Sequence, residues 1–183
     1  MKKKIAQTQL PLLSVLNVPH KKYDYVDSFQ SYLKDTENKF NSEDLGKAFF
    51  SSGPDWVEKL FNIRNKIVSK FGLKTSGNDN NRAEQLKNFK CEPGEQLGLF
   101  KVFAKTPNEV ILGEDDKHLN FRVSLFLEPH PTEINNKKIT ISTTVEFNNW
   151  FGRLYFLPVR PFHKLIVPTM LKGIIRTLEN PNK

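Results

Sequence analysis

Residues 150–178, WFGRLYFLPVRPFHKLIVPTMLKGIIRTL, decide the fold, because they have the period of one long helix with a broad apolar face. At about 100° per residue, Lys172 and Arg176 fall on the polar side. His163 falls inside the apolar arc, and so does Arg160 if the helix is continuous. The arc comprises Phe162, Ile166, Val167, Met170, Leu171, Ile174, Ile175 and Leu178. His163 is therefore either a core histidine with a structural partner or a histidine that points into a ligand cavity.

Prolines recur along this predicted helix, and each one removes a backbone hydrogen bond and clashes with the preceding turn. We expect Pro168 to kink the helix, and Pro158 and Pro161 to form a second weak point. The resulting curvature would let the helix follow a twisted sheet.

Charge is concentrated at the two ends of the chain. The chain has 183 residues, which suits one domain with a core, and its formal net charge is +8. Residues 1–22 contain five lysines and no acid, residues 150–183 are also basic, and the middle is nearly neutral. Such ends either hold nucleic acid or an anionic membrane, or keep a protein dissolved. Nucleic acid is disfavoured, since no zinc-finger, helix-turn-helix or RNA-recognition signature is present.

The single cysteine, Cys91, excludes an intramolecular disulfide framework and a cysteine-rich metal site, and it fits a reducing compartment. The start of the chain, MKKKIAQTQLPLLSVLNVP, lacks the unbroken apolar run and cleavage site of a signal peptide. We expect residues 1–22 to form a basic arm. The sequence contains no run of about 18 apolar residues, so no transmembrane segment is predicted. The expected location is the cytoplasm.

The rest of the chain alternates in a way that predicts a sheet with two short helices. Residues 23–33 predict a first strand, and Asn41 with Asp44 predicts the start of a short helix. Four further strands are predicted at residues 97–105, 109–112, 118–128 and 138–147, with residues 113–116 as a turn. In the last strand Thr140, Ser142 and Thr144 are expected to face away from the core. The order predicts an α+β helix-grip domain over residues 23–180. In such a domain a curved antiparallel sheet wraps around a long, kinked C-terminal helix, and a cavity lies between the sheet and the helix.

Residues 54–71 predict the second of the two helices, closed by Gly72. Arg64 falls near the centre of its apolar arc. It either packs its stem while its head pairs with an acid, or it anchors an anionic ligand group.

A second polar group, EDDKH, lies at residues 114–118, with Arg122 close by. An acid such as Asp116 beside His118 supports acid–base chemistry, but the same acids are also typical of a solvated turn. Plain alternation places Arg122 on the outer face of its strand. No phosphate loop, dinucleotide fingerprint, nucleophile elbow or metal-site motif is present, so no cofactor and no metal are indicated.

The motifs LGEDDKHLNFRVS at residues 112–124 and GRLYFLPVRPFHKLIVP at residues 152–168 resemble a bacterial family known as domain of unknown function 2867. KAFFSSGPDWVEKLF at residues 47–61, together with Arg64, fits the same family. The resemblance implies a layout similar to helix-grip domains of the START, polyketide-cyclase and plant-allergen type. By motif match, the resemblance implies that the polar positions of the family are Asp116, His118, Arg122, Arg153, Arg160 and His163 in this sequence. Asn120 stands where the resemblance leads us to expect an aspartate.

Three functions fit this sequence. The first is a binding module for a small, largely apolar or amphipathic ligand, with Arg64, Arg122, Arg153, Arg160 and His163 as ligand-binding residues. The second is a cyclase, dehydratase or hydrolase on the same scaffold, with His163, His118 and Asp116 as catalytic candidates. The third is a peripheral membrane or interaction protein that uses the basic N-terminal arm.

Overall fold

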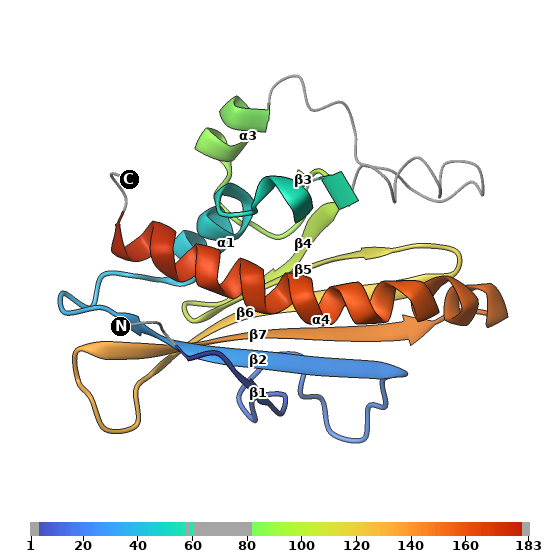
Figure 1. Cartoon of the computed structure of the whole chain (residues 1–183), viewed down its shortest axis with the longest axis horizontal. Coiled ribbons are helices and arrows are strands. Elements are labelled where there is room, and N and C mark those ends of the chain that lie inside the picture. The colour runs from blue at the N-terminus through green and yellow to red at the C-terminus, as the bar shows by residue number, and fades with distance from the viewer. Residues whose placement is uncertain (1–3, 58, 61–81, 181–183) are drawn as a thin grey trace.

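The computed structural model describes residues 4–57, 59–60 and 82–180, which form an antiparallel sheet with helices on one face (Figure 1). The strands are β1 (Ala6–Thr8), β2 (Tyr25–Lys34), β3 (Gln96–Leu97), β4 (Phe100–Lys105), β5 (Glu109–Asp115), β6 (Leu119–Pro129) and β7 (Asn136–Phe147). The helices are α1 (Ser42–Ser51), α3 (Arg82–Asn88) and α4 (Trp150–Glu179). The seven strands follow the order β1-β2-β7-β6-β5-β4-β3. The prediction of an α+β fold with a curved antiparallel sheet and a long C-terminal helix is confirmed.

Strand boundaries differ from the prediction in one functionally relevant place. β5 continues to Asp115, so Gly113, Glu114 and Asp115 pair with β6 instead of forming a turn. Glu114 lies opposite Phe121 and is buried. The prediction of a turn is wrong for Gly113, Glu114 and Asp115, because hydrogen bonding to β6 outweighs their turn preference, whereas Asp115 is exposed as a solvated acid would be. Most of the helix predicted at residues 54–71, including Arg64, lies outside the described residues.

Helix α1 begins as its sequence predicts. The Asn41 side chain accepts hydrogen bonds from the backbone of Glu43 and Asp44, and the Asp44 side chain accepts one from the Asn41 backbone. This reciprocal capping satisfies amide groups that have no partner inside the helix. Leu45 and Ala48 are buried, so α1 presents its apolar face to the core.

Helix α4 begins at an Asn149 cap and runs without interruption through Pro158, Pro161 and Pro168. Gly152 lies in its first turn, where an added Cβ would be 2.1 Å from the His118 carbonyl oxygen. A glycine is needed there because the helix approaches the β5–β6 turn backbone so closely. In Figure 1, α4 crosses one face of the sheet, and α1 lies beside its C-terminal half.

The main core lies between this face of the sheet, α1 and the C-terminal half of α4. From α4 it takes Val167, Met170, Leu171, Ile174 and Ile175. From the sheet it takes, among others, Phe29, Leu33, Val110, Leu112, Val123, Leu125, Leu127, Ile139 and Ile141. A smaller cluster of Tyr25, Leu119, Val145 and Phe156 lies under the N-terminal half of α4. Alternation along β6 and β7 thus places Val123, Leu125, Leu127, Ile139, Ile141 and Val145 on the face that α4 covers.

Part of the opposite face of the sheet is covered by the N-terminal segment. β1 pairs with β2, and the buried Glu109 carboxylate accepts hydrogen bonds from the Ser14 hydroxyl, the Val15 amide and the Ser124 hydroxyl. The described part of the expected basic arm, residues 4–22, is therefore attached to the sheet through β1, Ser14 and Val15, and Lys21 pairs with Glu146. Thr140, Ser142 and Thr144 face away from α4 as expected, yet all three are buried. The short Ser and Thr side chains leave room for the covering segment.

Candidate functional site

Strand β2 places one acid on the face that α4 covers. Tyr25, Asp27 and Phe29 alternate along the strand and therefore share this inner face. Asp27 is only 5% exposed, although a buried carboxylate is costly unless it is paired. The surroundings of Asp27 thus determine what this part of the molecule can do.

Helix α4 supplies a partner for this acid. His163 Nδ1 lies 3.0 Å from Asp27 Oδ2, and the Tyr25 hydroxyl donates to the same oxygen at 2.6 Å. The rings of Tyr25 and His163 stand edge to face with centroids 6.1 Å apart. Arg160, one helical turn before His163, lies with its guanidinium carbon 5.4 Å from the Tyr25 ring centroid. The prediction that His163 faces inward is therefore correct, and one of its partners is a buried carboxylate.

The second oxygen of this carboxylate has no hydrogen-bond partner. Asp27 Oδ1 is buried and unpartnered among the described residues, and so is Thr143 Oγ1. Thr143 is the residue of β7 that lies opposite Asp27 in the strand register. Buried polar atoms without partners are rare and costly, so each demands an explanation. We call Tyr25, Asp27, Thr143, Arg160 and His163 the Asp27 site.

Electrostatics fix the protonation state of Tyr25. Burial, followed by the hydrogen bond to Asp27 and its negative charge, raises the pKa of Tyr25 well above its ordinary value, while Arg160 opposes the rise. Tyr25 is therefore a neutral hydroxyl that donates to Asp27 throughout the physiological range. Because the hydrogen bond from Tyr25 is accepted by Oδ2 of Asp27, the other oxygen, Oδ1, is left as the acceptor for an additional donor.

The arrangement can also support proton transfer. A carboxylate on Nδ1 orients an imidazole and leaves Nε2 as the nitrogen that can take or give a proton. The His163 side chain is 17% exposed, so the ring reaches the margin of the buried region.

The predicted pair of His118 and Asp116 lies elsewhere. His118 Nδ1 contacts the Asn149 side chain at the start of α4, and its ring packs on Phe151. Gly152, which touches the His118 carbonyl, precedes His163 by roughly 16 Å along the helix axis, given about 1.5 Å per residue. The two histidines consequently belong to different places on the molecule.

The predicted arginines are also dispersed. Arg122 lies on the sheet face opposite α4, where it pairs with Asp115 at 2.8 Å and stacks on Phe103. Arg153 is exposed and lies 3.3 Å from Asp24. Of the predicted ligand-binding residues, only Arg160 and His163 come together, while Arg64 lies outside the described residues.

Sequence reasoning missed Asp27 and Tyr25. A signal was present, because Asp27 shares the strand parity of Tyr25, Phe29 and Leu33, so the predicted strand already placed an acid among apolar residues. Nothing in the sequence pairs Asp27 with His163, since 136 positions separate them.

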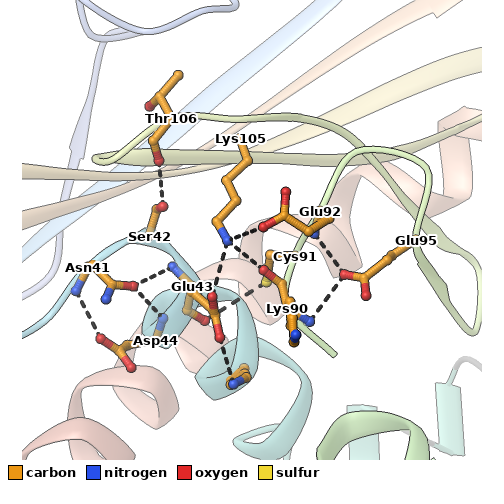
Figure 2. A network of polar contacts seen from close by, with 11 residues as sticks. Asn41, Ser42, Glu43, Asp44, Lys90, Cys91, Glu92, Glu95, Lys105 and Thr106 are labelled. Carbon is orange, nitrogen blue, oxygen red and sulfur yellow. Dashed lines mark hydrogen bonds and ion pairs between the residues drawn. The ribbon is translucent and has the colours of Figure 1, made fainter. Parts of the chain in front are cut away.

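A polar network on α1 and β4 is separate from the Asp27 site (Figure 2). Lys105 Nζ contacts Glu43 at 3.1 Å, Glu92 at 2.9 Å and the Lys90 carbonyl at 2.7 Å. Cys91 is buried beside it, and burial raises the pKa of the thiol to about 12. The thiol is therefore a poor nucleophile, and the network serves to hold α1 against the sheet.

An open hollow of about 350 Å³ lies at the C-terminal end of α4. It is lined by Lys34 at the end of β2, by mostly polar residues of the β2–α1 connection, and by Leu178, Glu179 and Asn180. It is remote from Asp27, because Lys34 at its wall follows Asp27 by seven residues of the extended strand, which is roughly 23 Å. The hollow is not the cavity predicted between the sheet and α4.

The sheet order and the single long helix define an α+β protein whose helix covers one face of an antiparallel sheet. The chain belongs to the family described as "Protein of unknown function (DUF2867)", whose family model matches residues 20–170. The family resemblance seen in the motifs is thereby confirmed. No curated protein and no solved structure matches the chain. Within the described ranges, no helix is both long and apolar enough to cross a bilayer.

Proposed function

We propose that this protein is a binding module that holds a small, largely apolar ligand between the sheet and α4, with a hydroxyl or amino group of the ligand donating to Asp27. The single observation that carries the proposal is the buried, unpartnered Oδ1 of Asp27. A ligand donor at this oxygen would remove the cost of the missing hydrogen bond.

The surroundings of Asp27 favour such a ligand. Tyr25, Val145 and Phe156 supply buried apolar surface next to the carboxylate, which is the usual composition of a small-molecule site. The Thr143 hydroxyl offers a second polar contact. Arg160 and His163 lie at the solvent-exposed edge of the Asp27 site. The proposed ligand enters past these two side chains. The helix-grip layout, with residues 23–180 as one domain, belongs to the same proposal.

Native mass spectrometry of the purified protein tests the proposal. We expect a bound molecule in the wild type, or uptake of a member of a library of apolar alcohols and amines. Asp27→Asn should lower the affinity for the ligand at least tenfold. The amide either removes the acceptor oxygen or points its own N–H donor at the donor group of the ligand. Asp116→Asn is the matched control, since Asp116 lies in the β5–β6 turn at the start of α4, away from the Asp27 site, and the variant should bind like the wild type.

Thr143→Val separates binding from stability. Valine has a similar shape without the hydroxyl. The free energy of unfolding of the variant should therefore equal that of the wild type or exceed it by up to about 1 kcal/mol. A weakened uptake with unchanged stability supports a ligand contact at Thr143. A clean apo mass for the wild type after exposure to the whole library would overturn the binding proposal.

A second function is favoured by one specific observation, the Asp27–His163 pair at 3.0 Å. In this reading Nε2 of His163 acts as a general base in a cyclase, dehydratase or hydrolase reaction. Nuclear magnetic resonance of the His163 ring decides between the two. Titration between pH 5 and 8, together with turnover that His163→Gln abolishes, supports the enzyme, whereas an unchanged ring signal supports binding alone.

A further inference from the structure

The outward side of residues 150–165, which we call the N-terminal half of α4, is apolar, in contrast to an ordinary surface helix. Trp150 is 74% exposed, Leu157 65% and Leu165 63%. Leu154 and the exposed Pro161 continue the same line, because steps of three and four residues keep side chains on one side of a helix. We call Trp150, Leu154, Leu157, Pro161 and Leu165 the α4 stripe. Single exposed leucines need no explanation, but a continuous stripe of this size marks an interaction surface.

One flank of the α4 stripe is basic. Arg153, Arg160 and Lys164 follow each other at steps of seven and four residues, which places them in a row along the helix. All three are exposed, and α4 carries no acid before Glu179. Among the described residues, the only ion pair of this row joins Arg153 to Asp24. The row is therefore a positive edge that is largely uncompensated within the described chain.

We propose that the α4 stripe binds the surface of an anionic lipid bilayer, with its apolar side chains at the acyl boundary and the basic row at the phosphate headgroups. Interfacial helices combine an apolar face with lysine and arginine in this way, and tryptophan is favoured at the boundary. The net charge of +8 would draw the protein toward such a surface.

Charge disfavours a second copy of the chain as the partner. In an antiparallel pair of α4 stripes, the two basic rows would lie on the same side of the contact. In a parallel pair each row would face the other flank of the stripe, where Pro158 and Phe162 are exposed and no acid is available. Neither arrangement neutralises the row, whereas lipid phosphates do.

This surface is distinct from the Asp27 site. His163 points from α4 toward the sheet, while the α4 stripe points away from it. Arg160 borders both regions, so it is left unchanged in the tests that follow. Membrane binding and ligand binding can therefore fail independently.

Sedimentation of the full chain with vesicles tests the proposal. We expect binding to vesicles of phosphatidylglycerol and phosphatidylcholine, weaker binding to phosphatidylcholine alone, and release by added salt. In a Trp56→Phe background Trp150 is the only tryptophan, so its fluorescence should shift to shorter wavelength on the anionic vesicles.

Matched variants assign the binding to the α4 stripe. Leu154→Glu with Leu157→Glu should weaken binding at least about tenfold, whereas Ile134→Glu, at an exposed isoleucine of the β6–β7 turn, should not. Arg153→Gln and Lys164→Gln should each weaken binding about fivefold, the equivalent of ~1 kcal/mol per basic residue near an anionic surface. Lys101→Gln, an exposed change on β4, should leave binding intact.

Three results would overturn the proposal. The first is equal vesicle binding by the wild type and the paired leucine variant. The second is a change in particle mass without vesicles when the leucines are replaced, which would make the α4 stripe a contact between copies. The third is binding that ignores lipid charge.

Discussion

The two halves of α4 have similar apolar content but opposite environments. In the C-terminal half, Leu171 and Ile174 are fully buried against the sheet and α1. In the N-terminal half, Leu157 and Leu165 face outward, and the inward side carries Gly152, Phe156 and His163. The difference shows that apolar content alone does not identify the core side of a helix. One half of α4 stabilises the fold, and the other half carries the polar site on one side and the α4 stripe on the other.

The largest expected effect comes from truncating one leucine in each half. Leu171→Ala should lower the free energy of unfolding by about 2–5 kcal/mol, because it leaves a cavity in the core. Leu165→Ala should change it by no more than about 0.5 kcal/mol, because that side chain is already in solvent. Urea denaturation measures both. Equal losses would show that Leu165 is covered and would remove the contrast between the two halves.

Glycines at the two ends of the helix provide the next comparison. A Cβ on Gly173 would lie 2.5 Å from the Ser52 carbonyl oxygen, and one on Gly152 would lie 2.1 Å from the His118 carbonyl oxygen. Alanine at either position should destabilise the protein by about 1–3 kcal/mol, since backbone must move in both cases. Gly53→Ala is the control, because its Cβ would meet the Met170 side chain at an ordinary contact distance of 3.6 Å. Thermal unfolding that left Gly152→Ala unchanged would contradict the close approach at the start of α4.

The smallest effect is the pH dependence that Tyr25 of β2 contributes beneath the N-terminal half of α4. Because the pKa of Tyr25 is higher in the folded than in the unfolded protein, the folded state keeps this proton above pH 10 while the unfolded state loses it. The stabilisation is present below pH 10 and is lost as the pH rises further. Tyr25→Phe should be less stable than the wild type at neutral pH, and the gap should narrow by roughly 1 kcal/mol per pH unit above 10. A gap that is constant with pH would show that Tyr25 titrates normally.

Local patterns predicted much of the fold. The Asn41 cap, the hairpins from β5 to β7 and the long α4 follow from capping residues and from periods of two and 3.6. The cover on the outer face could not be predicted in this way. It depends on Glu109 meeting Ser14 across 95 positions, and no local pattern records such a contact.

The candidate site was predicted only on its helical side. His163 and Arg160 follow from the helical angle, because a polar residue inside an apolar arc is conspicuous. Their partner Asp27 lies in a strand that has aromatic and polar residues on both of its faces. Alternation along such a strand does not single out one acid as buried. Arg122 and His118 stand near each other in the sequence, yet the sheet sends one to its far face and the other to the start of α4.

The strand order has a consequence for how the chain acquires its structure. β2, the first long strand, pairs with β7, the last one, and Ser28 contacts Ser142 across 114 positions. During synthesis β2 therefore has no long neighbour until residues 136–147 have left the ribosome. Pairing over such distances is slow, and exposed strand edges invite aggregation in the meantime. Truncation before residue 136 should therefore leave β2 without its long partner, so a nascent chain of that length exposes an unpaired strand edge and should depend on chaperones.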